Sequence, residues 1–114
     1  QWLMAQMGTI GPMIGQHHQF HHYNPGKSNW GEQRYFKIAR TIYKDLDERL
    51  EQNKFLAGEY SIADIICWPW VLIAKAMGRS LDPYPNVTKW RQIVKERPAV
   101  RKGVDLMRKK PKVV

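Results

Sequence analysis

Four neighbouring histidines have the spacing most typical of a metal site in this chain. His17 and His21, and likewise His18 and His22, are four residues apart, which lets two imidazoles on one helix face bind the same metal ion. No Cys, Asp or Glu lies within residues 1–27 to complete a tetrahedral site. We therefore expect no metal, and we interpret these residues as histidines near a helix C-terminus, where the helix dipole favours their charge.

Cys67 is the only thiol of the chain. It lies in an apolar run, where a cysteine usually packs as a small hydrophobic side chain rather than reacting as a nucleophile. A single cysteine cannot form an intrachain disulfide, which is compatible with a reducing compartment. We therefore expect no catalytic role for this thiol.

Basic residues concentrate at the C-terminal end. The 114 residues carry a formal net charge of +9, and residues 89–114 contain ten Lys or Arg but only two Asp or Glu. The run Arg108–Lys112, with Arg101 and Lys102 before it, could contact an anionic surface. No aromatic residue follows Trp90, so nucleic-acid bases would find no stacking platform there. We interpret the run as a solvated tail and expect no nucleic-acid partner.

Ser61 and Asp64 have the spacing of a helix capping box. The Ser61 side chain can accept a hydrogen bond from the N–H of Asp64, and the Asp64 carboxylate can accept one from the N–H of Ser61. Tyr60 and Ile65 are spaced to close a hydrophobic staple over this cap. The following helix is apolar on all sides after its first turn, which predicts burial in the middle of the domain. Ser61 and Asp64 are therefore predicted to act in folding rather than in chemistry.

Five helices account for the hydrophobic pattern, and no segment alternates with the period of a strand. They are expected at residues 1–22, 29–53, 61–78, 85–96 and 98–110. Pro12 and Pro69 each remove a backbone hydrogen bond inside a helix and are expected to bend it. Asn29 and Glu32 have capping-box spacing at the start of the second helix. The chain is therefore predicted to be one all-α domain.

Apolar residues at helical spacing mark the predicted core. They are Leu3, Met7, Ile10 and Ile14, then Tyr35, Ile38, Ile42, Leu46 and Leu50, then Val87, Trp90, Val94, Val100, Val104 and Met107. Gly8 and Gly11 would let another helix approach the first one closely. The longest apolar run has ten residues, far fewer than the ~20 that cross a membrane, so no membrane partner is expected.

Several motifs resemble those of one protein family. The capping-box segment resembles the signature of the C-terminal helical domain of cytosolic glutathione transferases. Other motifs resemble the nu class, which contains bacterial glutathione-dependent disulfide-bond reductases and is related to a yeast nitrogen-regulator prion protein. The motifs are Phe55-Leu56-Ala57-Gly58-Glu59-Tyr60-Ser61-Ile62-Ala63-Asp64, Gln1-Trp2-Leu3, Met7-Gly8, Gly11-Pro12-Met13, Gly15-Gln16, Gln33-Arg34-Tyr35, Cys67-Trp68-Pro69-Trp70, Tyr84-Pro85-Asn86-Val87 and Arg97-Pro98-Ala99.

The resemblance implies that residues 1–114 form a five-helix bundle of the glutathione transferase C-terminal type. In such enzymes a thioredoxin-like domain precedes this one and carries the catalytic residues, and we expect that domain to be absent here. We therefore expect no catalytic residue in the chain and no activity from the chain alone. The parent protein would be a cytoplasmic homodimer that uses glutathione as a cosubstrate to conjugate electrophiles or to reduce disulfides.

Arg34 and Gln1 are the glutathione-binding candidates that the resemblance implies. In the nu class, an arginine at the position of Arg34 in Gln33-Arg34-Tyr35 contacts glutathione. A guanidinium can pair bidentately with a carboxylate, and glutathione has two. The simpler alternative for Arg34 is a solvated arginine on a helix surface.

The first turns of the N-terminal helix are expected to form the wall of the electrophile or disulfide pocket. In the family these turns face the catalytic domain, and Trp and Met side chains suit varied apolar ligands. The residues concerned are Trp2, Met4, Gln6 and Met7. Plain interdomain packing is the simpler alternative, and both interpretations predict an exposed apolar patch. The alternative function is a non-catalytic protein-interaction module with the same fold.

Overall fold

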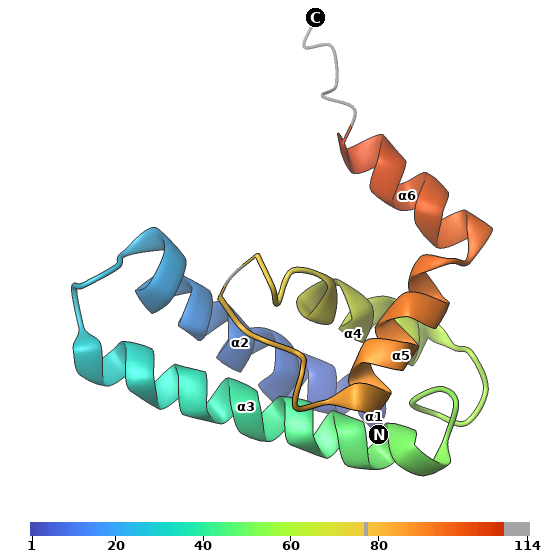
Figure 1. The fold of residues 1–114 in the computed structure, drawn as a ribbon, viewed down its shortest axis with the longest axis horizontal. Coiled ribbons are helices and arrows are strands. Elements are labelled where there is room, and N and C mark those ends of the chain that lie inside the picture. The colour runs from blue at the N-terminus through green and yellow to red at the C-terminus, as the bar shows by residue number, and fades with distance from the viewer. Residues whose placement is uncertain (77, 109–114) are drawn as a thin grey trace, which may run out of the picture.

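The structure is a computed structural model that describes residues 1–76 and 78–108 (Figure 1). An unbroken N-terminal helical stretch contains α1 (Trp2–Ala5), the π-helix η1 (Gln6–Ile10), α2 (Gly11–His18) and the π-helix η2 (Gln19–Tyr23). It is followed by α3 (Asn29–Gln52), α4 (Ile62–Leu72), α5 (Pro85–Lys95) and α6 (Pro98–Arg108). The predicted all-α fold with five helices is confirmed, and the described residues contain no strand.

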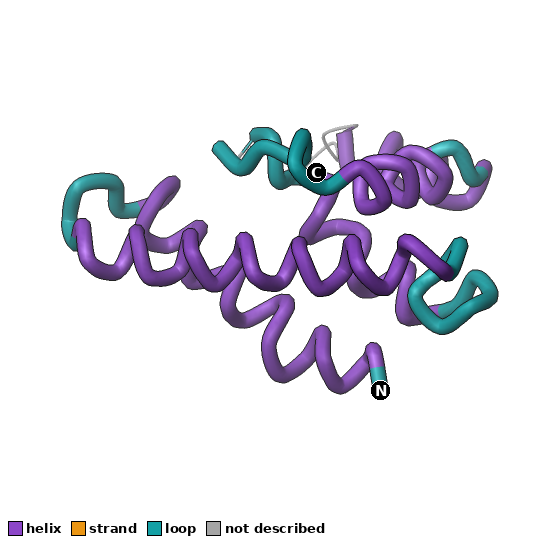
Figure 2. The backbone as a smooth tube through the Cα atoms, turned by 60° about the horizontal axis from the view of Figure 1, so that its bottom comes forward, coloured by secondary structure: helices purple, strands orange, loops and turns teal. Residues whose placement is uncertain are grey.

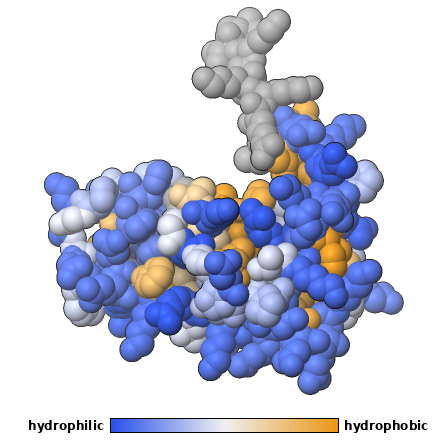
Figure 3. All heavy atoms as spheres, in the orientation of Figure 1, coloured by the Kyte–Doolittle hydropathy of each residue, from blue (hydrophilic) through white to orange (hydrophobic). Residues whose placement is uncertain are grey.

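The N-terminal helical stretch and α3 form an antiparallel hairpin, joined by the turn at residues 24–28 (Figure 1, Figure 2). Helices α4 and α5 pack against this hairpin and against each other. Helix α6 extends away from the body and contacts α5 (Figure 1). The side of the molecule seen in Figure 3 is largely hydrophilic, with apolar side chains gathered near α5 and α6. None of the described helices is both long enough and apolar enough to span a membrane.

The N-terminal stretch changes its winding just before Pro12. The N–H of Gly11 donates to the carbonyl of Gln6, five residues earlier, as in a π-helix. A π-turn contains more residues than an α-turn, so the side chains before it are rotated relative to those after it. Ile10 and Ile14 are buried as predicted, but the prediction that Met7 lies in the same inward stripe is wrong, because Met7 is exposed.

The cap of α3 also differs from the prediction. Helix α3 begins at Asn29, but the capping residue is Ser28, whose Oγ accepts a hydrogen bond from the N–H of Gly31 at 3.0 Å. The Glu32 carboxylate contacts His21 instead, at 2.8 Å. The predicted Asn29–Glu32 capping box is therefore wrong, because Ser28 supplies the cap and Glu32 has another partner.

The core lies where α3, α4 and α5 meet. Besides Ile10 and Ile14, six predicted core residues of α3 and α5 are buried, namely Ile42, Leu46, Leu50, Val87, Trp90 and Val94. Tyr35, Ile38, Val100 and Val104 are only partly buried. The side chain of Met107 and the basic residues at 109–112 lie outside the described part of the chain, so their predicted roles stay predictions.

Helix α4 is shorter and more exposed than predicted. It ends at Leu72 rather than near Gly78. Its inner face buries Ala63, Cys67 and Val71, whereas Ile62 and Ile65 are exposed. The prediction that this helix is buried on all sides is therefore wrong, because only one of its faces packs against the rest of the domain.

Candidate functional site

Exposed apolar side chains occur on two helical segments that are far apart in sequence but pack against each other. Met4 of α1 and Met7 of η1 expose 76% and 69% of their surface, and Ile62 and Ile65 of α4 expose 59% and 50%. Both α1 and η1 contact α4, so these four exposed side chains come from helical segments that lie next to each other. We call this set the apolar face. Large exposed apolar patches on soluble proteins usually mark interaction sites.

Gln1 and Trp2 lie beside a cleft of ≈ 390 Å³ at the N-terminal end of the hairpin. Arg49 of α3 also lines this cleft, together with Ser61 and Ile62 at the start of α4. Gln1 is exposed, whereas Trp2 is partly buried and packs against the core. The cleft is therefore continuous with the apolar face through Ile62.

Gln6 differs from the other pocket residues predicted for this helix because it is buried. Its side chain lies against Gly11, where a Cβ atom would come within 2.9 Å of the Gln6 Nε2 and 3.4 Å of the Trp70 ring. Its Oε1 has no hydrogen-bond partner among the described residues. Gly11 thus makes room for side chains of its own domain, while the space around Gly8 is open.

Arg34 projects from α3 beside two aromatic rings. The Cζ of its guanidinium lies 5.5 Å from the ring centroid of Trp30 and 5.9 Å from that of Tyr35, within the range of a cation–π interaction. Trp30 is itself largely exposed. Among the described residues, no carboxylate oxygen lies within 4.0 Å of this guanidinium. Its charge is therefore available to an anionic ligand.

The structure does not bring Arg34 and Gln1 together. Arg34 lies near the start of α3, whereas Arg49, which shares the cleft with Gln1, lies near its end. Fifteen residues of α-helix separate the two arginines by about 22 Å. A tripeptide such as glutathione spans only about 10 Å when extended. The two predicted glutathione-binding residues therefore lie near opposite ends of α3.

Asp64 forms the predicted cap and also two bonds that the sequence did not indicate. Its Oδ2 accepts a hydrogen bond from the N–H of Ser61 at 3.0 Å, and the Ser61 hydroxyl accepts one from the N–H of Ala63 at 3.2 Å. The capping box is complete. The Asp64 Oδ1 accepts hydrogen bonds from the N–H of Leu56 at 3.1 Å and from Nε1 of Trp90 at 2.8 Å. This fully buried carboxylate thus joins α4 to α5 and to the preceding loop.

Tyr60 packs edge-on against Phe55 and carries the Arg97 guanidinium 3.5 Å from its ring centroid. Ile65, its predicted partner in a hydrophobic staple, is half exposed. The contacts of Tyr60 therefore link the loop before α4 to the turn before α6.

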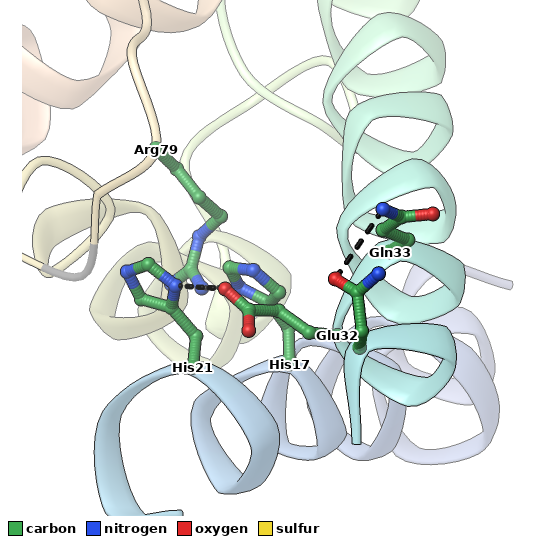
Figure 4. A network of polar contacts seen from close by, with 6 residues as sticks. His17, His21, Glu32, Gln33 and Arg79 are labelled. Carbon is green, nitrogen blue, oxygen red and sulfur yellow. Dashed lines mark hydrogen bonds and ion pairs between the residues drawn. The ribbon is translucent and has the colours of Figure 1, made fainter. Parts of the chain in front are cut away.

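Two of the four histidines bind a buried arginine that sequence reasoning missed. Arg79 is only 2% exposed. Its Nη1 lies 2.7 Å from the Nδ1 of His17, its Nη2 lies 2.7 Å from the Nε2 of His18, and its Nε donates to the Tyr43 hydroxyl at 2.8 Å. Figure 4 shows Arg79 reaching toward α2 from the loop after α4. We call these four residues the arginine cage.

A glycine turn aims Arg79 into the domain. Gly78 has a φ of +78°, which suits glycine. The N–H of Arg79 bonds to the carbonyl of Ala74 at 2.8 Å and that of Gly78 to the carbonyl of Lys75 at 3.2 Å. This is the Schellman pattern that ends many helices. Gly78 lies beyond the end of α4 at Leu72, and nothing in the local sequence indicates that the residue after it turns inward.

His21 and Glu32 extend the cage toward the surface. The His21 Nδ1 lies 2.8 Å from the Glu32 Oε1, and the His21 ring stacks on that of His17 with centroids 5.1 Å apart (Figure 4). Within the described ranges, residues 1–76 and 78–108, this is the only contact of 4.0 Å or less between a basic and an acidic side chain. The Glu32 carboxylate thus contacts a histidine beside the cage and not Arg79 itself.

His17 and His18 are held neutral by their surroundings. Burial, followed by the positive charge of Arg79, lowers the pKa of each imidazole to about 4. Each neutral ring can then accept a hydrogen bond from the guanidinium. The interpretation of these two histidines as cations beside a helix dipole is therefore wrong. Within the described residues, no group of three or more His, Cys, Asp or Glu side chains is placed to hold a metal ion.

Cys67 is buried in the inner face of α4. Burial, followed by the nearby charge of Asp64, raises the pKa of its thiol to about 12. The thiolate that would act as a nucleophile is therefore disfavoured at neutral pH.

The chain is similar in sequence to glutathione S-transferases and related proteins. The model of a family described as "Glutathione S-transferase, C-terminal domain" matches residues 31–98. The disulfide-bond oxidoreductase YfcG of Escherichia coli is 43% identical over 100 residues, which are 87% of this chain and 46% of that protein. The disulfide-bond oxidoreductase YghU of Escherichia coli is 36% identical over 110 residues, which are 90% of this chain and 38% of that protein.

Solved structures show the same similarity. The glutathione transferase URE2P6 of Phanerochaete chrysosporium, in complex with oxidized glutathione, superimposes with a TM-score of 0.88 at 30% identity, covering 96% of this chain and 52% of that one. A glutathione transferase of Burkholderia graminis with two bound glutathione molecules per subunit gives 0.83 at 33% identity, covering 100% and 49%. The chain spans about half, or less, of the length of each of these proteins.

Proposed function

The chain belongs to the glutathione S-transferase C-terminal domain family, in the nu-class-like branch, and from this premise we propose that it supplies the pocket wall and dimer contacts of a glutathione-dependent enzyme. The reaction is conjugation of glutathione to an electrophile or glutathione-dependent reduction of a disulfide. A thioredoxin-like domain supplies the catalytic residues, so the chain alone is inactive. The cytoplasm, where glutathione keeps thiols reduced, is the proposed location.

The observation that carries this proposal is the apolar face. Four large side chains, Met4, Met7, Ile62 and Ile65, are exposed on adjacent helical segments. Their exposure is costly in water, and covering them with a second domain recovers about 25 cal/mol per Å² of apolar surface. We propose that the thioredoxin-like domain covers this face and that Met4 and Met7, at its edge, line the substrate pocket. The partly buried Trp2 packs behind these pocket residues, and the buried Gln6 holds in place the helix that carries Met4 and Met7.

The separation of Arg34 from Gln1 supports a homodimer. We propose that Gln1 lies beside the glutathione of its own subunit. Because about 22 Å of α3 separates the two ends of the hairpin, Arg34 then reaches the glutathione bound by the second subunit. Its guanidinium, which rests beside Trp30 and Tyr35 without a carboxylate partner among the described residues, would pair with a glutathione carboxylate.

A chimaera tests the proposed activity. The chain is joined to the thioredoxin-like part of YfcG of Escherichia coli, and glutathione-dependent reduction of a small model disulfide is followed. We expect the chimaera to be active and the chain alone to be inactive. A folded, dimeric chimaera without activity toward disulfides or electrophiles would contradict the proposal.

In this chimaera, replacing Arg34 with alanine is expected to raise the KM for glutathione about tenfold, because a charge-assisted pair worth about 1.4 kcal/mol is lost. The matched control is Arg40→Ala, since Arg40 is an exposed arginine of the same helix that also lies over an aromatic ring, that of Phe36. An equal rise in KM in both variants would assign the effect to general charge rather than to a glutathione contact.

Charged residues on the apolar face are expected to prevent docking of the thioredoxin-like domain. With the two domains produced as separate chains, Met7→Glu should weaken their association at least tenfold, because a buried charge without a partner is costly. Leu106→Glu is the control, since Leu106 is equally exposed but lies on α6. Association can be measured by calorimetry.

The alternative function, a non-catalytic interaction module, makes a different prediction for the same face. It predicts that the chain captures other proteins, and that joint substitution of Trp2 and Met7 abolishes all of these interactions. Binding confined to the thioredoxin-like domain favours the enzyme.

A further inference from the structure

A basic cleft lies between the turn that follows α4 and helix α5, away from the four residues of the apolar face. Its volume is ≈ 480 Å³, and its lining includes Lys75, Arg79, Arg91 and one acidic residue, Asp82. Three cationic side chains and one carboxylate leave a net charge of +2 around this cleft. We call it the basic cleft.

The charge of Arg79 is not neutralised by any group that it contacts. Its three hydrogen-bond partners are Tyr43, His17 and His18, which are all uncharged at neutral pH. Among the described residues, no carboxylate oxygen lies within 4.0 Å of the Arg79 nitrogens, and Glu32 contacts His21. A buried cation without a carboxylate partner is unusual, because its desolvation is normally offset by an ion pair. An anion in the adjoining basic cleft would provide that compensation.

Arg91 has an unused donor beside the same cleft. Its Nη2 donates to the carbonyl of Leu72 at 2.8 Å, which fixes the side chain between α4 and α5. Its Nε is buried, and no acceptor among the described residues reaches it. A buried donor without an acceptor costs about 1–3 kcal/mol, so a turn of the Arg91 side chain that brings this donor to an acceptor in the cleft would be favourable. The orphaned atom is an observation independent of the cleft's charge.

Hydroxyl groups complete the lining. The Ser80 Oγ accepts a hydrogen bond from the N–H of Asp82 at 3.2 Å, so its own hydrogen remains available to a ligand. The Thr88 hydroxyl, by contrast, already donates to backbone carbonyls. The cleft thus combines guanidinium, ammonium and hydroxyl donors, which are the groups that bind phosphate in proteins.

We propose that the basic cleft binds a phosphate group, either as inorganic phosphate or as part of a small phosphomonoester. A dianion matches the net charge of +2 around the cleft, and ≈ 480 Å³ leaves room for an organic substituent. Lys75 is the exposed residue that captures the anion, and Arg91 donates to it from the wall. The proposal does not depend on the glutathione-linked function, because it concerns different residues and can be tested on the chain itself.

The test is a titration of the ¹⁵N-labelled 114-residue chain at pH 7.5 and constant ionic strength. Inorganic phosphate and glycerol phosphate are added in separate arms, with acetate and chloride as comparison anions. Saturable shifts of the amide signals of Gly78 and Ser80 are expected with the two phosphates, and much weaker ones with acetate. The ligand with the lower Kd, inorganic phosphate or glycerol phosphate, is the preferred form of the phosphate group.

Lys75→Gln is the decisive variant, because Lys75 is exposed and its replacement leaves the fold intact. We expect it to weaken phosphate binding at least fivefold. Lys89→Gln is the matched control, since Lys89 lies on α5 and is also exposed but lines a different cleft. Absence of saturable binding would overturn the proposal. Equal weakening of phosphate binding in both variants would also overturn it, because it would indicate diffuse attraction of the anion to a basic protein.

Discussion

Replacing Asp64 with alanine is expected to lower the free energy of unfolding by about 4 kcal/mol or more. The carboxylate is fully buried and accepts hydrogen bonds from Leu56, Ser61 and Trp90. Hydrogen bonds to a charged group contribute about 1.5–3 kcal/mol each, and the donors left behind would be buried without acceptors. Urea denaturation followed by circular dichroism measures the change.

Three variants identify which part of this carboxylate matters. Ser61→Ala removes only the reciprocal half of the cap and should cost about 1 kcal/mol. Trp90→Phe removes the donor at Oδ1 while keeping a large ring in the core, so its cost should lie between the other two. Asp45→Ala, at an exposed acidic residue of α3, is the control and should have little effect. If Asp64→Ala cost no more than Ser61→Ala, the link from α4 to α5 would contribute nothing measurable.

Lowering the pH from 7.5 to 5 is expected to destabilise the chain by about 2–4 kcal/mol, through the arginine cage. The pKa values of His17 and His18 are lowered to about 4, whereas unfolded histidines titrate near 6.5. Between these values the unfolded state binds more protons than the folded state, so acid favours unfolding. The stabilisation is complete above about pH 6.5 and is lost progressively as the pH falls toward 4. Urea denaturation at several pH values measures it.

The groups around the two histidines act in opposite directions. Burial and the charge of Arg79 oppose protonation of both rings, whereas Glu32 favours protonation of His17 to a smaller extent. His21 lies near both rings, and His22 near His18, and each opposes protonation when charged itself.

Glutamine variants separate the cage from the other titrating groups. His17→Gln and His18→Gln each keep an acceptor for Arg79 but cannot bind a proton, so each should remove about half of the pH dependence between 5 and 7.5. His22→Gln is the control, since His22 is exposed. If the control flattened the pH dependence as strongly as the cage variants, other groups would be responsible.

The helices could be predicted because their signals are local. Pro85 and Pro98 mark the first residues of α5 and α6, and Asn53 marks the end of α3. The errors arose where contacts between distant segments decided the outcome. Met7 is exposed rather than buried because the π-turn changes the direction of its side chain. Glu32 does not cap α3 because its carboxylate is within hydrogen-bond distance of His21. The spacing of residues in the sequence predicts neither the π-turn nor the contact between His21 and Glu32.

In the candidate site, too, local features could be predicted from the sequence, whereas contacts between distant segments could not. The exposure of Met4 and Met7 agrees with the expected apolar patch. The bond between Asp64 and Trp90 spans 26 residues, and that between Arg79 and His17 spans 62. Such long-range pairs depend on how the helices cross, which a single sequence does not specify. For this reason the sequence alone predicts neither the place of Arg79 nor the neutral state of His17 and His18.

The π-helix η1 gives the N-terminal helix a natural point for inserting or deleting a residue. A π-turn holds one residue more than an α-turn, so removing one residue from this segment would restore ordinary winding and leave the residues on both sides facing nearly as before, with Ile10 and Ile14 in their places in the core. Only side chains inside the segment, such as that of Met7, would then face a different direction, and the fold behind them would be unchanged. A change of length in this helix can thus redirect single exposed side chains without any substitution in the core.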